Sequence, residues 1–271
     1  MNLIKFLYYM YYRPKIFLPK KSYSMFGEDI FIEKFFRKKS NGVYLDVGCY
    51  HPLEGNNTYL LYKKGWNGMN IDLNKTSIEL FNKARQNDVN LRIAISNKYK
   101  KVKFFYRKKI NMLNTINTKF ANISFKSGFK TNSIQADTLN SVLEKSKLKN
   151  KKIDFLNIDI EGNEINALKS LNFNKYSPKL ICVEIHNYPA NSSKPAKLLY
   201  HPYISEAGER GPFINSKAQA GPNLSVQSAL LIKVFNELCI TSFFPTITPI
   251  GIPFAIVFPN ATISGLIPIS L

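Results

Sequence analysis

The amino-acid sequence predicts an α/β fold in which helices cover a doubly wound parallel sheet. From Gly42 onward, short β-branched apolar runs alternate with amphipathic stretches, the order that builds such a sheet. The chain has 271 residues, which is long enough for one full core of this kind. With 45% hydrophobic and 21% charged residues, its composition is that of a folded globular protein rather than a disordered one.

The predicted elements follow one another along the chain. Strands are expected at residues 43–47, 68–73, 91–95, 102–106, 153–158 and 180–185. Helices are expected at residues 58–64, 76–86, 138–147 and 163–171. Gly65 is expected to cap the first helix, because glycine readily adopts the left-handed conformation that ends many helices.

The formal net charge of +20 suggests a polyanionic partner, since a basic excess attracts nucleic acid without regard to sequence. Lysines are spread over almost every predicted element, however, which disfavours a dedicated nucleic-acid site. Cys49, Cys182 and Cys239 lie far apart with no C-x-x-C pair, so neither a disulfide framework nor a zinc site is indicated. A reducing, cytoplasmic setting is therefore expected.

The first 23 residues form a basic and aromatic arm. Pro14 and Pro19 interrupt it, so it contains no apolar span of membrane length and does not resemble a signal peptide. One interpretation is an arm packed on the domain. The other is an arm that lies on an anionic membrane surface, which would make the protein peripheral to the membrane.

The composition changes near residue 200. Residues 200–271 contain three basic residues, three acidic residues and eight of the fourteen prolines, so the whole net charge lies upstream. Prolines exclude a regular helix from most of this apolar stretch, and only residues 224–238 read as an amphipathic helix. We therefore divide the chain into an arm (1–23), a main domain (24–199) and an atypical, proline-rich tail (200–271) that is expected to be poorly packed. The tail is either a lipophilic extension or a replaced native ending, for example from a shifted reading frame, and we favour replacement.

Two predicted strands end in a carboxylate at the place where doubly wound sheets bind ligands. Asp46 closes the first strand, and the glycine that follows, Gly48, would let backbone amides approach a ligand closely. The NAD fingerprint G-x-G-x-x-G is absent, and an ordinary strand exit would look the same. Asp72 closes the second strand, where a carboxylate can accept two hydrogen bonds from a ribose diol or can simply precede a helix.

A third strand, F-L-N-I-D-I-E-G-N-E, runs into Asp159 and Glu161. Buried carboxylates are costly unless they are paired or functional. If the strand continues, both point to the same side, where they could position a hydroxyl, ligate a cation or raise each other's pKa. The alternative is that Glu161 caps the following helix.

Seven motifs between residues 24 and 187 carry a family resemblance. They are S-M-F-G-E-D, Y-L-D-V-G-C-Y-H-P, G-N-N-T-Y-L-L-Y-K-K-G-W, N-I-D-L-N, L-R-I-A-I-S-N, F-L-N-I-D-I-E-G and I-C-V-E-I-H-N. In this order and spacing the chain resembles the FkbM family of methyltransferases. The resemblance implies a Rossmann-like methyltransferase sheet, S-adenosylmethionine as cofactor, and acceptors that are hydroxyls of natural products or sugars. By this resemblance Asp46 and Gly48 would border the methionine part of the cofactor, Asp72 its ribose, and Ala94 to Ser96 its adenine.

Methyl transfer to a hydroxyl requires alignment of the reactants and a base. Asp159 is the first candidate for that base, Glu161 the second and His186 the third, because a histidine near neutral pKa suits proton removal. His51 lies beside the proposed cofactor loop and is a further contact candidate. The acids Asp159, Glu161 and Glu184 would also suit magnesium, although their spacing does not demand a metal.

The sequence thus predicts an S-adenosylmethionine-dependent O-methyltransferase that acts on a saccharide or a small hydroxylated metabolite. One alternative is a non-catalytic module of the same fold that binds nucleic acid or another anionic partner. Another is an RNA methyltransferase, which would need a basic channel at the acceptor face.

Overall fold

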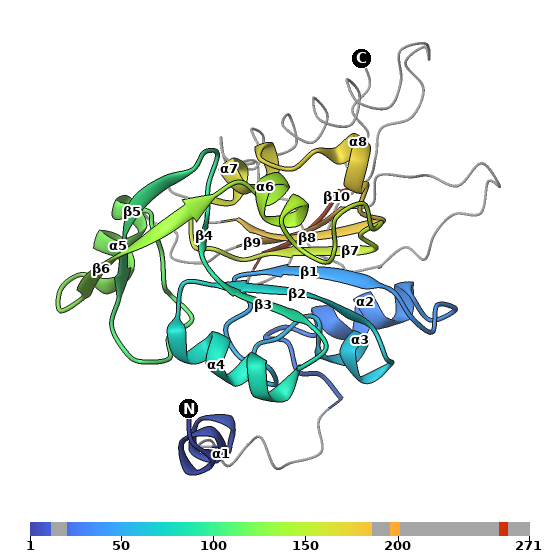
Figure 1. Ribbon diagram of the computed structural model, residues 1–271, viewed down its shortest axis with the longest axis horizontal. Helices are drawn as coiled ribbons and strands as arrows, with labels where there is room; N and C mark the ends of the chain where they lie inside the picture. The colour runs from blue at the N-terminus through green and yellow to red at the C-terminus, as the bar shows by residue number, and fades with distance from the viewer. Residues whose placement is uncertain (12–20, 186–195, 201–254, 260–271) are drawn as a thin grey trace.

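The computed structural model describes residues 1–11, 21–185, 196–200 and 255–259, and its centre is a seven-stranded sheet (Figure 1). The strand order is β10-β9-β8-β7-β1-β2-β3. The bounds are β1 Val43–Val47, β2 Asn67–Asp72, β3 Val89–Arg92, β7 Phe155–Ile158, β8 Leu180–Ile185, β9 Ala196–Tyr200 and β10 Ala255–Pro259. The five strands from β8 to β3 are parallel, whereas β9 and β10 are antiparallel. The predicted α/β class with a mostly parallel, Rossmann-like sheet is confirmed.

Helices cover both faces of this sheet. The helices of the described residues are α1 Leu3–Tyr11, α2 Glu28–Phe35, α3 Tyr59–Lys63, α4 Lys75–Ala84, α5 Thr118–Phe125, α6 Leu139–Glu144, α7 Glu164–Lys169 and α8 Phe173–Tyr176. Figure 1 shows α6, α7 and α8 on one side and α2, α3 and α4 on the other. Side chains of β1 alternate between the two layers: Tyr44 packs with Trp66 near α2 and α3, whereas Leu45 and Val47 pack in the larger cluster with α6 to α8.

The predicted helix cap at Gly65 is confirmed. Gly65 has a left-handed φ of 91°, and its N–H donates to the carbonyl of Tyr62 at 2.9 Å. The N–H of Trp66 donates to the carbonyl of Leu61 at 3.2 Å. These two bonds form a Schellman motif, which satisfies carbonyls that the end of α3 would otherwise leave unpaired.

The prediction of one strand over residues 91–95 is wrong. Val89–Arg92 pairs with β2, but Ala94–Ile95 forms β4, which belongs to a separate three-stranded sheet of order β4-β6-β5. The other members are β5 Lys100–Tyr106 and β6 Lys130–Asp137. Ile93, Ala94 and Ile95 are all apolar because they line a cleft between the two sheets, so hydrophobicity could not reveal the break.

The described part of the N-terminal arm is α1, which packs against α4. Met10 is buried, and the Lys83 ammonium lies 6.0 Å from the ring centre of Phe6. The N-terminal ammonium lies 3.8 Å from the Glu79 carboxylate. Among the described residues, none of the helices combines the length and apolar character needed to span a membrane.

Most of the predicted tail (200–271), including the expected helix at 224–238, lies outside the described residues. Its described piece, β10, is the last strand of the sheet and pairs with β9. Pro259 is paired with Ala196 there, and an edge strand is where a proline is tolerated.

Candidate functional site

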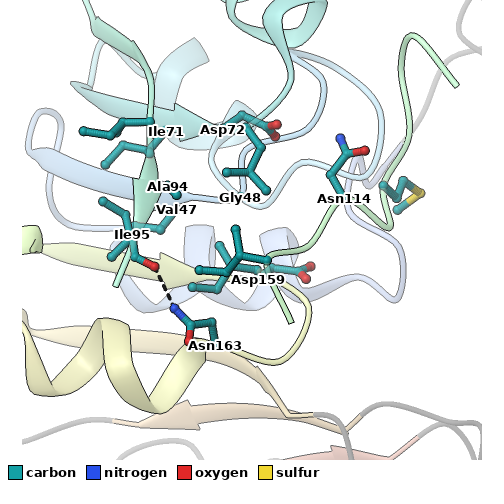
Figure 2. Close-up of a pocket in the computed structure, with 14 residues that line it drawn as sticks. Val47, Gly48, Ile71, Asp72, Ala94, Ile95, Asn114, Asp159 and Asn163 are labelled. Atoms are coloured by element: carbon teal, nitrogen blue, oxygen red, sulfur yellow. Dashed lines mark hydrogen bonds between the residues drawn. The ribbon is translucent and has the colours of Figure 1, made fainter. Parts of the chain in front are cut away.

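A cleft opens at the carboxyl ends of β1, β2 and β7, where the strand order reverses (Figure 2). Its lining residues are Val47, Gly48, Ile71, Asp72, Leu73, Ile93, Ala94, Ile95, Met112, Asn114, Ile116, Asp159, Ile160 and Asn163. The empty space between them is about 440 Å³, counting the part open to solvent. Doubly wound sheets bind ligands at this position, so the cleft is the candidate site.

Asp72 is buried at the end of β2 and is held by the backbone. Its Oδ2 accepts the N–H of Tyr50 at 2.9 Å, and its Oδ1 accepts the N–H of Asn74 at 2.6 Å. Burial raises the pKa of Asp72 to about 6, although the two N–H donors oppose the rise. The nearby charges of Asp46 and Asp159 raise it further. The carboxylate is thus fixed in place, and its ionisation is costly until a cation or a hydrogen-bond donor arrives.

Gly48 joins two turns that form the floor of the cleft. It has a φ of 88°, and its N–H donates to the carbonyl of Ile71 at 2.8 Å. A Cβ at this position would lie 1.7 Å from the carbonyl oxygen of Asp159. Only glycine therefore allows the turn after β1 to touch the turn after β7.

Replacing Gly48 by alanine is expected to destabilise the fold by several kcal/mol. The left-handed conformation alone costs an L-residue about 1–2 kcal/mol, and the clash must also displace the backbone of Asp159. Gly65→Ala is the matched control, because Gly65 has a similar φ of 91° but open space around its Cβ. Denaturant unfolding should show a clearly larger loss for Gly48→Ala, and equal losses would mean that the turn relaxes freely.

Asp159 follows β7 and faces the same cleft as Asp72 (Figure 2). Its backbone is fixed because its N–H donates to the carbonyl of Val47 at 2.8 Å. The lining contains these two acids and no basic side chain, although the chain carries a net charge of +20. The cleft is therefore suited to a cation rather than to a phosphate.

The wall opposite the strand ends comes from the segment 111–117. Asn114 lines the cleft, and its Nδ2 donates to the carbonyl of Asn111 at 2.8 Å, which fixes the orientation of the amide. Its Oδ1 is buried and has no hydrogen-bond partner among the described residues. The segment is anchored because Thr115 Oγ1 and Asn117 Nδ2 each donate, at 2.7 Å, to the carbonyls of Glu161 and Gly162. Asn114 was not predicted, since nothing in a polar loop marks one asparagine as buried.

The strand β4 supplies the third wall. Ala94 and Ile95 line the cleft, and the carbonyl of Ile95 accepts Nδ2 of Asn163 at 2.7 Å. Ser96 lies just beyond the lining, with its N–H bonded to the carbonyl of Asp137 at 2.9 Å. Of the residues expected to contact adenine, Ala94 thus lines the cleft, while Ser96 lies behind the lining.

Comparison with known proteins shows which family the chain is similar to. A family model described as the methyltransferase FkbM domain matches residues 46–210, which is more than half of the chain. The chain belongs to the FkbM methyltransferase family. A stretch of 31 residues is 71% identical to erythritol kinase of Brucella abortus (strain 2308), but it covers only 11% of this chain and 6% of that protein, too little to bear on fold or function. No solved structure matches the chain significantly.

In this FkbM-family chain Asp46 lies behind the cleft rather than in its lining. It shares the face of β1 with Tyr44, because side chains alternate along a strand. Thr58 Oγ1 and Asn157 Nδ2 each donate to its carboxylate at 2.8 Å. Burial raises the pKa of Asp46, while Asn157 and the charge of Arg85 oppose the rise. Its predicted contact with the cofactor remains a prediction.

Arg85 is the buried cation of this methyltransferase domain, and sequence reasoning missed it. Its guanidinium donates at 2.8 Å to Thr58 Oγ1, to Asn56 Oδ1 and to the carbonyl of Pro52. It therefore fixes the loop between Gly48 and α3. An arginine near the end of an amphipathic helix normally faces solvent, so this role could not be predicted from the sequence.

The strand does not continue through Asp159 and Glu161, so the condition for both side chains to point to the same side is not met. β7 ends at Ile158, and Glu161 adopts a left-handed φ of 59° in the turn that follows. Glu161 is buried but does not line the cleft. The N–H of Gly162 donates to Oε1 of Glu164 at 2.8 Å at the start of α7, and the predicted capping role of Glu161 stays a prediction.

The histidine and metal predictions have different outcomes. His186 lies outside the described residues. His51 is buried outside the lining: its Nδ1 accepts the N–H groups of Leu53 and Glu54 at 3.1 and 3.0 Å, so Nε2 carries the proton and donates to the carbonyl of Tyr9 at 3.1 Å. Within the described ranges no group of three or more His, Cys, Asp or Glu side chains is placed to hold a metal ion, and Glu184 lies on β8.

Proposed function

We propose that the chain is an S-adenosylmethionine-dependent methyltransferase that methylates a hydroxyl of a saccharide or a small metabolite. The observation that carries the proposal is a cleft lined by two carboxylates and by no basic side chain, in a chain of net charge +20. S-adenosylmethionine carries a sulfonium and an ammonium, so such a cleft attracts it. A phosphate-bearing ligand would be repelled from the same lining, which disfavours nucleic acid there.

The lining residues also match the parts of S-adenosylmethionine. Each oxygen of the Asp72 carboxylate accepts one backbone N–H and can also accept a hydrogen bond from a ribose diol. Asn114 lines the cleft, and its Oδ1 is a buried acceptor without a partner among the described residues. Such an acceptor costs about 1–3 kcal/mol until a donor reaches it. Ile93, Ala94 and Ile95 provide an apolar wall for a flat base.

The chemical step needs little from the protein beyond alignment and a base. When bound, the cofactor supplies a methyl group that is already activated by its sulfonium. Asp159 would accept the proton of the acceptor hydroxyl, since its carboxylate faces the cleft and its backbone is fixed by Val47. Gly48 keeps the floor of the cleft close to Asp159. Cys49 and Cys182 are buried and form no disulfide in the part of the chain that the structure describes, which supports a reducing, cytoplasmic setting.

Incubation with radiolabelled S-adenosylmethionine and fractionated cell glycans, lipids, small metabolites and RNA tests the proposal. Label is expected in the glycan or small-metabolite fraction. Label in RNA would make the chain an RNA methyltransferase. Binding without transfer to any fraction would indicate a non-catalytic module.

The affinity for S-adenosylmethionine is expected to fall as the pH drops below about 6. The cofactor favours the ionised Asp72, so binding at low pH must first release the proton of Asp72, at about tenfold in affinity for each pH unit below the pKa. The stability of the unliganded fold should change in the opposite direction. The pKa of Asp72 is raised in the folded protein, so the folded state binds this proton more tightly than the unfolded state does. The resulting gain in the free energy of unfolding is complete below the ordinary pKa of an aspartate and is lost as the pH rises through about 6. Titration calorimetry between about pH 5 and about pH 7 measures the effect, and a flat profile would contradict it.

A further inference from the structure

The helix α1 is apolar around almost its whole circumference. Its inner face consists of Phe6, Tyr9 and Met10, of which Met10 is buried against the domain. Its outer face is made of large apolar side chains that remain exposed: Leu3 65%, Ile4 79%, Leu7 46%, Tyr8 62% and Tyr11 37%. At 3.6 residues per turn these five fall within one unbroken arc of about 140°. A helix that is apolar on all sides normally has apolar surroundings on all sides, and α1 has them on one.

The charge around α1 indicates what its outer face meets. Residues 1–27 contain five basic residues, Lys5, Arg13, Lys15, Lys20 and Lys21, and no acidic residue. Two tyrosines, Tyr8 and Tyr11, contribute to the outer face, and tyrosine is enriched where apolar and aqueous regions meet. Apolar side chains flanked by lysines are the composition of helices that lie in the headgroup region of an anionic membrane.

A second copy of the chain fits this face less well. Each copy carries a net charge of +20, and pairing two basic arms would bring like charges together. An anionic lipid surface instead attracts each lysine near it.

We propose that the outer face of α1, formed by Leu3, Ile4, Leu7, Tyr8 and Tyr11, docks the protein on an anionic membrane surface. The apolar side chains enter the headgroup region while Lys5 of the same helix contacts lipid phosphates and carboxylates. The inner face stays on the domain, where His51 Nε2 donates to the carbonyl of Tyr9 at 3.1 Å. The adjacent Tyr50 N–H holds Asp72, so the docked helix would keep the cleft near the lipid surface. The proposal does not depend on the chemistry in the cleft.

The test is sedimentation of the full-length chain with lipid vesicles, without cofactor. The wild type is expected to bind vesicles that contain phosphatidylserine and to bind pure phosphatidylcholine far more weakly. The double variant Ile4→Glu with Leu7→Glu should bind at least about tenfold more weakly, because burying one such side chain is worth about 1.5–3 kcal/mol. Ile123→Glu is the control: Ile123 is 57% exposed on α5, and its substitution adds one negative charge away from α1, compared with two in the double variant.

Three outcomes would overturn the proposal. The wild type could remain in solution with anionic vesicles. The double variant could bind as well as the wild type, or Ile123→Glu could lose as much binding as the double variant, which would make the attraction a matter of net charge alone. Light scattering that shows a wild-type dimer split by the double variant, without vesicle binding, would assign the face to a second copy. Vesicle binding and methyl transfer are measured separately, so either can fail without the other.

Discussion

Replacing Asp72 by alanine is expected to weaken S-adenosylmethionine binding about 10- to 150-fold. A hydrogen bond to a charged group contributes about 1.5–3 kcal/mol, and each 1.4 kcal/mol is tenfold in affinity. Asp72 can make such bonds because the N–H groups of Tyr50 and Asn74 hold its carboxylate at the mouth of the cleft. Titration calorimetry of the purified variant measures the loss.

The same substitution removes the acceptor of two backbone N–H groups, so a control must separate binding from stability. Asp137→Asn serves this purpose, because Asp137 is also a buried acid at the end of a strand, bonded to Ser141 and Lys145 away from the cleft. It should lower the unfolding temperature and leave cofactor affinity unchanged. Unchanged affinity in a folded Asp72→Ala protein would remove Asp72 from the cofactor site.

Sequence reasoning located the central strands because they are buried on both faces. Residues 43–47 and 180–185 were predicted with the bounds that β1 and β8 show. It missed β6, whose first four residues are exposed and polar, since that strand forms through pairing with β5 and not through its own hydrophobic pattern. The break at Ile93 was hidden for a different reason: neighbouring apolar residues there belong to two different sheets.

The candidate site divides along a similar line. Gly48, Asp72 and Asp159 were predicted from strand ends, and Ala94 from the family resemblance. All four line the cleft, and topology brings the parallel strand ends together there. The opposite wall, with Asn114, comes from a loop between Ser96 and Asp159, the nearest predicted site residues along the chain. Its position depends on hydrogen bonds to carbonyls that no motif encodes. Which side of a strand end faces the ligand also escaped prediction: Asp46 and Asp72 look alike in sequence, yet Asp46 faces the buried network of Arg85.

Asp159→Asn is expected to lower turnover by about 10²–10⁴-fold while cofactor affinity changes far less. A positioned general base typically contributes that much, and an amide of the same shape cannot accept the proton of the hydroxyl. The side chain lies in the cleft, and its backbone bond to Val47 does not involve the carboxylate, so the variant should fold. Single-turnover rates with saturating cofactor measure the chemical step.

Glu161→Gln is the matched comparison, since it also replaces a carboxylate by an amide two residues further along the same turn. Because Glu161 does not line the cleft, its variant should lose much less turnover than Asp159→Asn. If Glu161→Gln is the slower variant, the base is Glu161 and the turn must rearrange when the acceptor binds. If both variants transfer methyl groups at the normal rate, Asp159 is structural and His186 becomes the next candidate.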